Sequence, residues 1–207
     1  MAKLLFNEAE QYLLNSWSSA SLLEQSMIAV RRKYSGLCDG VVAAVREKHP
    51  RLDAGGAYVT STTDDGSIGI GRKIWGEPGS YPCGFYIGNL LLEAMLSSEE
   101  AKPPWAAIWI WPAKHIGIDR LVAKAKVLAA APKVLATDEW SRCRRDDGDK
   151  NYIFWYDLPE SREELLKMLL DGDGQKFAAC LISYFDLLAR FIPVLDEVLA
   201  VPGKAKG

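Results

Sequence analysis

The sequence predicts an α+β fold, a mostly antiparallel sheet of about four to six strands with amino-terminal and carboxyl-terminal helices packed against it. Two observations support this prediction. Apolar residues recur at helical spacing at both ends of the chain, whereas strand-forming residues fill the middle. With 207 residues, the chain can bury a core without a metal or a disulfide. We expect residues 1–202 to form a single α+β domain and the polar residues 203–207 to be a disordered tail.

The amino-terminal third is predicted to be helical. Apolar residues spaced three and four apart indicate helices near residues 4–13 and 22–30, separated by the stretch 16–21. A further helix-like segment covers residues 41–48. It is expected to stop before Pro50, because the residue that precedes a proline is disfavoured in the helical region.

The middle of the chain is predicted to supply the first strands. Residues 57–62 and 67–75 are rich in strand formers and flank the turn residues 63–66, which indicates a β-hairpin. Further patterns predict a strand at residues 83–88, a helix at 90–96 and a strand at 105–111 that Pro112 closes.

The last part of the chain is predicted to be mostly helical. An alanine-rich helix is expected at residues 119–131, followed by a short strand at 134–136, a long loop at 137–150 and a final strand at 152–156. Ser161 and Glu164 have the spacing of a capping box, in which each side chain satisfies the other's backbone N–H. The closing helix has an apolar stripe between Phe177 and Leu195, and Pro193 is expected to kink or end it.

Charge and composition exclude several classes of protein. The 25 Lys and Arg residues are balanced by 27 Asp and Glu residues, so a nucleic-acid partner bound through phosphates is not expected. No apolar run is long enough to span a membrane, and the first residues lack a secretory signal, which indicates a cytoplasmic protein without a membrane partner. The four cysteines form no close pair, so we expect free thiols and no zinc site.

Catalytic motifs are sparse. Gly36, Cys38 and Gly40 have the spacing of a nucleophile elbow with Cys in place of Ser, but they follow a helix-like segment instead of a buried strand. The alternative is an interhelical turn with a small buried Cys. The two histidines, His49 and His115, are expected at a helix end and in a solvated loop, although His115 could also pair with Asp119.

Acidic clusters offer few convincing metal sites. They lie at residues 64–65, 146–149 and 171–173; the last resembles a calcium loop but has Ile182 where a Glu is required. Glu100 and Lys102 have the spacing of a metal-dependent nuclease motif, within a predicted loop. Gly69 and Gly71 lie within a strand and are not followed by a helix, so they form no dinucleotide fingerprint. No metal and no cofactor are predicted.

The tryptophans indicate a surface. On a strand, Trp105, Trp109 and Trp111 share one face, opposite the small and aliphatic residues Ala106, Ile108 and Ile110. Tyr152, Phe154 and Tyr156 are likewise expected to share a face, opposite Ile153 and Trp155. Either the carboxyl-terminal helices cover the aromatic side, or part of it stays open and binds a ligand or partner.

A second cluster lies in the predicted loop, where Trp140, Arg142, Arg144 and Arg145 precede acidic residues. Either the acidic residues neutralise the arginines and the segment is solvated, or the cluster is a small patch that binds an anion or a protein.

The sequence therefore favours a non-catalytic protein-interaction module, a regulator, inhibitor or accessory factor. It would bind a protein partner through Trp105, Trp109, Trp111, Trp140, Arg142, Arg144 and Arg145. The alternative is a hydrolase, either with Cys38 as nucleophile or as a metal-dependent nuclease.

Overall fold

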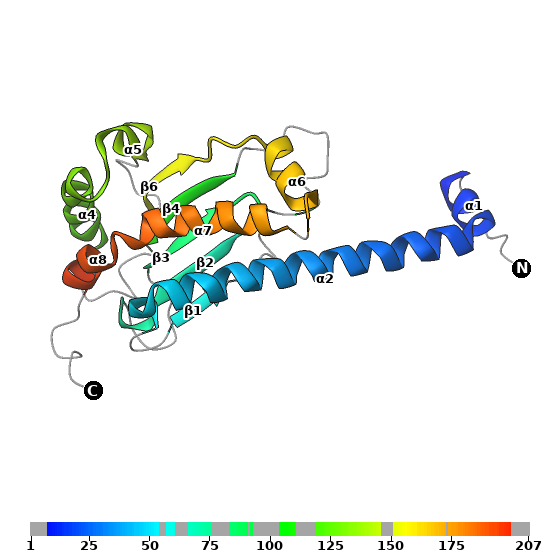
Figure 1. Ribbon diagram of the computed structural model, residues 1–207, viewed down its shortest axis with the longest axis horizontal. Helices are drawn as coiled ribbons and strands as arrows, with labels where there is room; N and C mark the ends of the chain where they lie inside the picture. The colour runs from blue at the N-terminus through cyan, green and yellow to red at the C-terminus, as the bar shows by residue number, and fades with distance from the viewer. Residues whose placement is uncertain are drawn as a thin grey trace, which may run out of the picture.

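The computed structural model describes residues 8–53, 57–60, 66–75, 83–90, 92, 104–110, 119–145, 151–172 and 174–199. Helices pack on one face of a sheet, and the first part of helix α2 (Trp17–Lys48) projects far beyond this body (Figure 1). Within the described residues no single helix is long and apolar enough to span a membrane. Helices α7 (Gln175–Ala189) and α8 (Ile192–Leu199), bent by 45°, meet the length and composition requirement only when taken together.

Six strands form one antiparallel sheet in the order β1-β2-β3-β4-β6-β5. Its strands are β1 (Ala57–Thr60), β2 (Ile68–Arg72), β3 (Cys83–Gly88), β4 (Trp105–Ile110), β5 (Arg144–Arg145) and β6 (Tyr152–Asp157). The first four strands follow each other in the chain and in space. The α+β fold and the hairpin expected at residues 57–75 are confirmed.

One face of this sheet carries the main core. Phe85 and Ile87 on β3 and Ile108 on β4 are fully buried there, because alternate residues of a strand point to the same face. Helix α7 covers them with the buried side chains Phe177, Leu181, Phe185 and Leu188. The apolar stripe predicted for the closing helix is thus confirmed, and it is interrupted after Ala189, with Pro193 in the first turn of α8.

Helix α2 contradicts the predicted arrangement of the amino-terminal third. It is one continuous helix of 32 residues, and only Ser16 separates it from α1 (Glu8–Asn15). The break expected across residues 16–21, the separate helix at 41–48 and the turn at Gly36–Gly40 were therefore wrong. Glycine costs a helix roughly 1 kcal/mol, but this cost is outweighed by the burial of Tyr34, Cys38, Val41, Val42 and Val45 on one stripe. The predicted end before Pro50 is confirmed.

The segment after β4 contains more helix than expected. Helix α4 (Arg120–Val134) continues past Pro132, because its last turn is still closed by the hydrogen bond from the Leu135 N–H to the Ala131 carbonyl. The strand predicted at 134–136 was wrong, because Val134 ends α4 and the next two residues connect it to helix α5 (Thr137–Arg142). Helix α5 and strand β5 replace much of the loop predicted at 137–150. The Glu139 carboxylate accepts the Ala136 N–H at 2.8 Å and so stabilises the start of α5.

Helix α6 (Arg162–Leu170) begins as the sequence predicts. The Ser161 N–H donates to Glu164 Oε2 at 2.7 Å, and the Glu164 N–H donates to Ser161 Oγ at 3.2 Å. The capping box is confirmed, and it fixes the start of the helix that packs beside α7.

Two carboxylates tie the helices to the rest of the body. Asp186 of α7 accepts hydrogen bonds from Lys48 Nζ at 2.5 Å and lies 2.7 Å from His49 Nε2, at the end of α2. Asp196 of α8 pairs with the buried Arg72 of β2 and accepts the indole N–H of Trp75 at 2.8 Å. These contacts hold α2 against α7 and α8 against the sheet.

The glycines of α2 supply a test of its continuity. A Cβ added at Gly36 or Gly40 would meet nothing within 4 Å. Gly36→Ala and Gly40→Ala should therefore each raise the free energy of unfolding by about 0.5–1 kcal/mol, because alanine loses less backbone entropy in a helix. Urea denaturation measures this change, and a loss of stability in both variants would contradict a continuous helix.

Asp186 supplies a test of the contact between α2 and α7. Burial alone would raise the pKa of its carboxyl, but the hydrogen bonds from Lys48 and His49 outweigh burial and lower the pKa. A lowered carboxyl pKa stabilises the fold above the unfolded-state pKa, and the stabilisation is lost as the pH falls through the folded-state pKa. Asp186→Asn should be less stable than the wild type near neutral pH, and the difference should shrink in acid. A pH series of unfolding curves measures it; a constant difference would contradict the assignment.

Candidate functional site

The face of the sheet opposite the helices carries a cluster of aromatic side chains, which we call the aromatic face: Tyr86, Trp105, Trp109, Tyr152 and Trp155. The Trp109 and Tyr152 rings are 4.7 Å apart, Trp105 and Tyr152 5.3 Å, and Tyr86 and Trp109 5.6 Å. Tyr86 is buried and the other four are half-buried. Within the described residues, the ring contacts of this cluster join strands only to strands.

The carboxyl-terminal helices and the tryptophans of β4 lie on opposite sides of the sheet. Of the two alternatives for the tryptophans, covering by the Phe177–Leu195 stripe is wrong, because that stripe packs on the opposite face, against residues such as Phe154. Tyr86 and the fully buried Ala107 lie outside the main core cluster, which confirms that the aromatic face is a separate environment.

A bulge between Ile108 and Trp109 changes the expected pattern on β6. Tyr152 pairs with Trp109, whereas Phe154 pairs with Ile108, so Tyr152 and Phe154 lie on opposite faces. The predicted common face of Tyr152, Phe154 and Tyr156 was therefore wrong for Tyr152. The bulge brings Tyr152 together with Trp155 and so enlarges the aromatic face.

Glycines pair with the aromatic residues across the strands. Gly88 pairs with Trp105, Gly84 with Trp109, and Gly69 with Tyr86. A Cβ on Gly88 would lie 2.2 Å from a ring carbon of Trp105, so the indole lies directly over the glycine. Large rings cover backbone that would otherwise be exposed, which stabilises glycine-containing strands.

The arginines of β5 are divided between the two faces. Arg144 pairs in register with Trp155 and forms a 2.6 Å ion pair with Asp157, so it borders the aromatic face. Arg145 pairs in register with Phe154 and lies over Trp140, 4.8 Å from the ring centroid, on the helical side. The sheet thus separates the predicted residues into two groups.

Trp140 is anchored to the body. Its ring lies 6.0 Å from that of Phe154 in an edge contact, and Arg190 holds the same helix through two hydrogen bonds to Glu139. Arg142 is exposed at the end of α5. Trp111 lies outside the described residues. The structure therefore groups Trp105 and Trp109 with Arg144, and Trp140 with Arg145.

The cysteines do not provide an activated nucleophile in the described structure. Cys38 is buried in the middle of α2, so the strand-to-helix elbow does not exist and the proposed geometry was wrong. Burial raises the pKa of the Cys143 thiol to about 11 and that of Cys180 to about 12, and it also raises the pKa of Cys83. Raised thiol pKa values disfavour the reactive thiolate.

No group of three or more His, Cys, Asp or Glu side chains in the described part of the chain could hold a metal ion. Of the predicted acidic clusters, Asp171 forms an ion pair with Lys176. The clusters at 64–65 and 146–149, the pair Glu100 and Lys102, and His115 lie outside the described residues, as does Asp173. Gly69 and Gly71 lie within β2, as expected.

The projecting part of α2, residues 17–33, is a feature that our sequence analysis missed. We call it the arm. Its side chains Leu23, Met27 and Val30 are 63%, 47% and 50% exposed, although they continue the stripe that buries Tyr34 and Cys38. Their helical spacing is visible in the sequence, but only the three-dimensional structure shows that no described element of the chain covers them.

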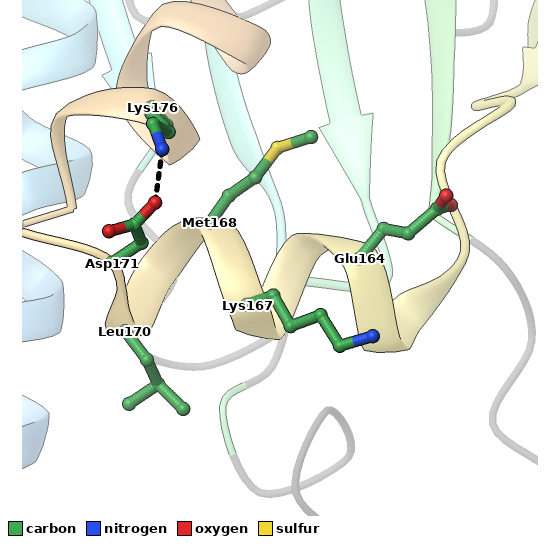
Figure 2. A pocket seen from close by; sticks show the side chains of 6 residues that line it. All are labelled: Glu164, Lys167, Met168, Leu170, Asp171 and Lys176. Carbon is green, nitrogen blue, oxygen red and sulfur yellow. Dashed lines mark hydrogen bonds and ion pairs between the residues drawn. The ribbon is translucent and has the colours of Figure 1, made fainter.

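Two depressions lie near the base of the arm. The first, of about 260 Å³, is lined by Val30, Lys33, Tyr34, Leu37, Leu92, Leu169, Leu170 and Gly174, and we call it the base groove. The second, of about 590 Å³, lies along α6 between Glu164 and Lys176. Figure 2 shows the side chains that line this second depression, among them Leu170 and the ion pair of Lys176 with Asp171. Leu170 is 81% exposed and borders both depressions.

Comparison of the chain with protein families, curated proteins and solved structures found no match.

The contact between Gly88 and Trp105 supplies a test of the aromatic face. Gly88→Ala should lower the free energy of unfolding by about 1–3 kcal/mol, because the added methyl group collides with the indole. In a Trp105→Ala background the same change should cost much less. A double-mutant cycle measures the coupling, and additive effects would contradict the contact.

Proposed function

We propose that this protein is a non-catalytic protein-interaction module, a regulator, inhibitor or accessory factor that binds its partner through the aromatic face and Arg144. One observation carries the proposal: the rings of Trp105, Trp109 and Trp155 are half-buried on the side of the sheet opposite the α7 layer, beside an exposed arginine.

The chemistry of this surface suits a protein partner. Trp, Tyr and Arg are the residues that most often dominate binding energy at protein interfaces, because they combine large apolar area with a polar group. Strand pairing and ring contacts fix these rings before binding, so little conformational entropy is lost when a partner docks. The ion pair with Asp157 orients the Arg144 side chain at the border of the face.

The hydrolase alternative receives less support from the geometry. The Cys38 version depends on an elbow that the continuous helix α2 replaces. The nuclease version depends on Glu100 and Lys102 or on acidic clusters. Most of these residues lie outside the described part of the chain. No observation on the described residues favours either version over the interaction module.

Substitutions at the border of the aromatic face test the proposal. Arg144→Glu and Trp155→Ala should each weaken partner binding at least about tenfold, the effect expected for hot-spot residues. Chemical cross-linking in the source cells, followed by mass spectrometry, identifies the partner, and titration with the purified partner measures the affinity.

Lys126→Glu is the matched control for Arg144→Glu, because it makes the same charge change at an exposed position on α4. This control should bind like the wild type. Binding that is unchanged in both Arg144→Glu and Trp155→Ala, with melting temperatures preserved, would remove this face from consideration.

A further inference from the structure

We propose that the arm binds the arm of a second copy of this chain, in an antiparallel pair related by a two-fold axis. The inference is independent of the aromatic face and starts from the apolar stripe of the arm. Ala20, Leu23, Met27 and Val30 continue into Tyr34 and Leu37 with alternating spacings of three and four residues. That is the a and d pattern of a two-stranded coiled coil.

The two halves of this stripe have different environments. From Tyr34 onward it is buried by the body of the same chain, whereas Leu23, Met27 and Val30 are about half exposed or more. The arm spans 17 residues of α2, or about 25 Å. An exposed apolar stripe of this length indicates a binding surface for another helix.

Charge identifies the occupant as a second copy. Charged side chains between residues 8 and 30 are all acidic, namely Glu8, Glu10 and Glu24, and they are followed at the base of the arm by Arg31, Arg32 and Lys33. In an antiparallel pair, Glu24 of each arm lies beside the basic base of the other. The surface is therefore complementary to itself under a two-fold rotation.

The heptad positions make the pairing specific. With Met27 at a and Val30 at d, Glu24 and Arg31 both occupy e positions. Antiparallel helices bring e positions together, so Glu24 of each copy faces Arg31 of the other when Met27 packs in the same layer as Val30 of the second copy. A parallel pair would instead place Ser19 beside Glu24 and Ser26 beside Arg31, without any opposite charges.

The tip of the second arm reaches the base groove, where the body of the first copy begins to cover the stripe. In this register Leu23 of one copy lies in the layer of Tyr34 of the other, and Ala20 lies in the layer of Leu37. Tyr34 and Leu37 line the base groove together with Lys33 and Leu170. The apolar tip of the arm therefore meets an apolar groove.

The oligomeric state tests the proposal. Sedimentation velocity across a concentration series should show a monomer–dimer equilibrium for the wild-type chain. A species that stays monomeric at the highest concentrations would overturn the inference, whether or not another protein binds the arm.

Leu23→Glu and Leu22→Glu form a matched pair, because the two leucines are neighbours and are 63% and 66% exposed. Leu23 lies on the stripe, whereas Leu22 lies outside it. Leu23→Glu should abolish the dimer and Leu22→Glu should leave it in place, with both variants retaining the circular dichroism of the wild type. Equal effects of the two substitutions would overturn the assignment of the stripe.

Charge reversal tests the orientation. Glu24→Arg and Arg31→Glu should each weaken the dimer roughly five- to tenfold, because each creates two like-charged contacts. The double variant should recover most of the affinity, and Arg32→Glu, which makes the same charge change away from the seam, should have little effect. A double variant weaker than either single variant would overturn the antiparallel register.

Discussion

Helix α7, which packs against both the sheet and α2, determines much of this structure. Its buried residues Phe177, Leu181 and Phe185 cover the core face of the sheet, and its Asp186 holds the end of α2. Because α7 occupies one face of the sheet, the tryptophans of β4 lie on the other. Because α7 packs against only part of α2, the remainder of that helix leaves the body as the arm.

The sequence predicts those parts of the fold that local chemistry decides. The hairpin at residues 57–75, the capping box at Ser161 and the end of α2 before Pro50 each depend on residues close together in the chain. The continuity of α2 could not be predicted in this way. Gly36 and Gly40 favour a turn locally, but the side chains buried on the same helix favour continuation, and their burial depends on α7 and the sheet.

The candidate surfaces, like the fold, could be predicted only where neighbouring residues in the chain determine them. Strand alternation predicts that Trp105 and Trp109 share a face, and they do. The bulge that adds Tyr152 to this face follows from the pairing of β6 with β4, which is distant in the chain. Arg144 and Arg145 lie on opposite faces because they form strand β5, where the sequence predicts a loop. The arm was missed for a related reason: its apolar spacing is indistinguishable in sequence from that of a helix buried in the core.

The continuity of α2 also has a mechanical consequence. A helix of 32 residues spans about 48 Å, and it runs without interruption from the tip of the arm to the contact of Lys48 and His49 with Asp186. A continuous helix of this length is a rigid element. Because the helix is unbroken from Trp17 to Lys48, the tip of the arm and the end buried beside α7 belong to one rigid element, and their relative orientation is fixed without a hinge.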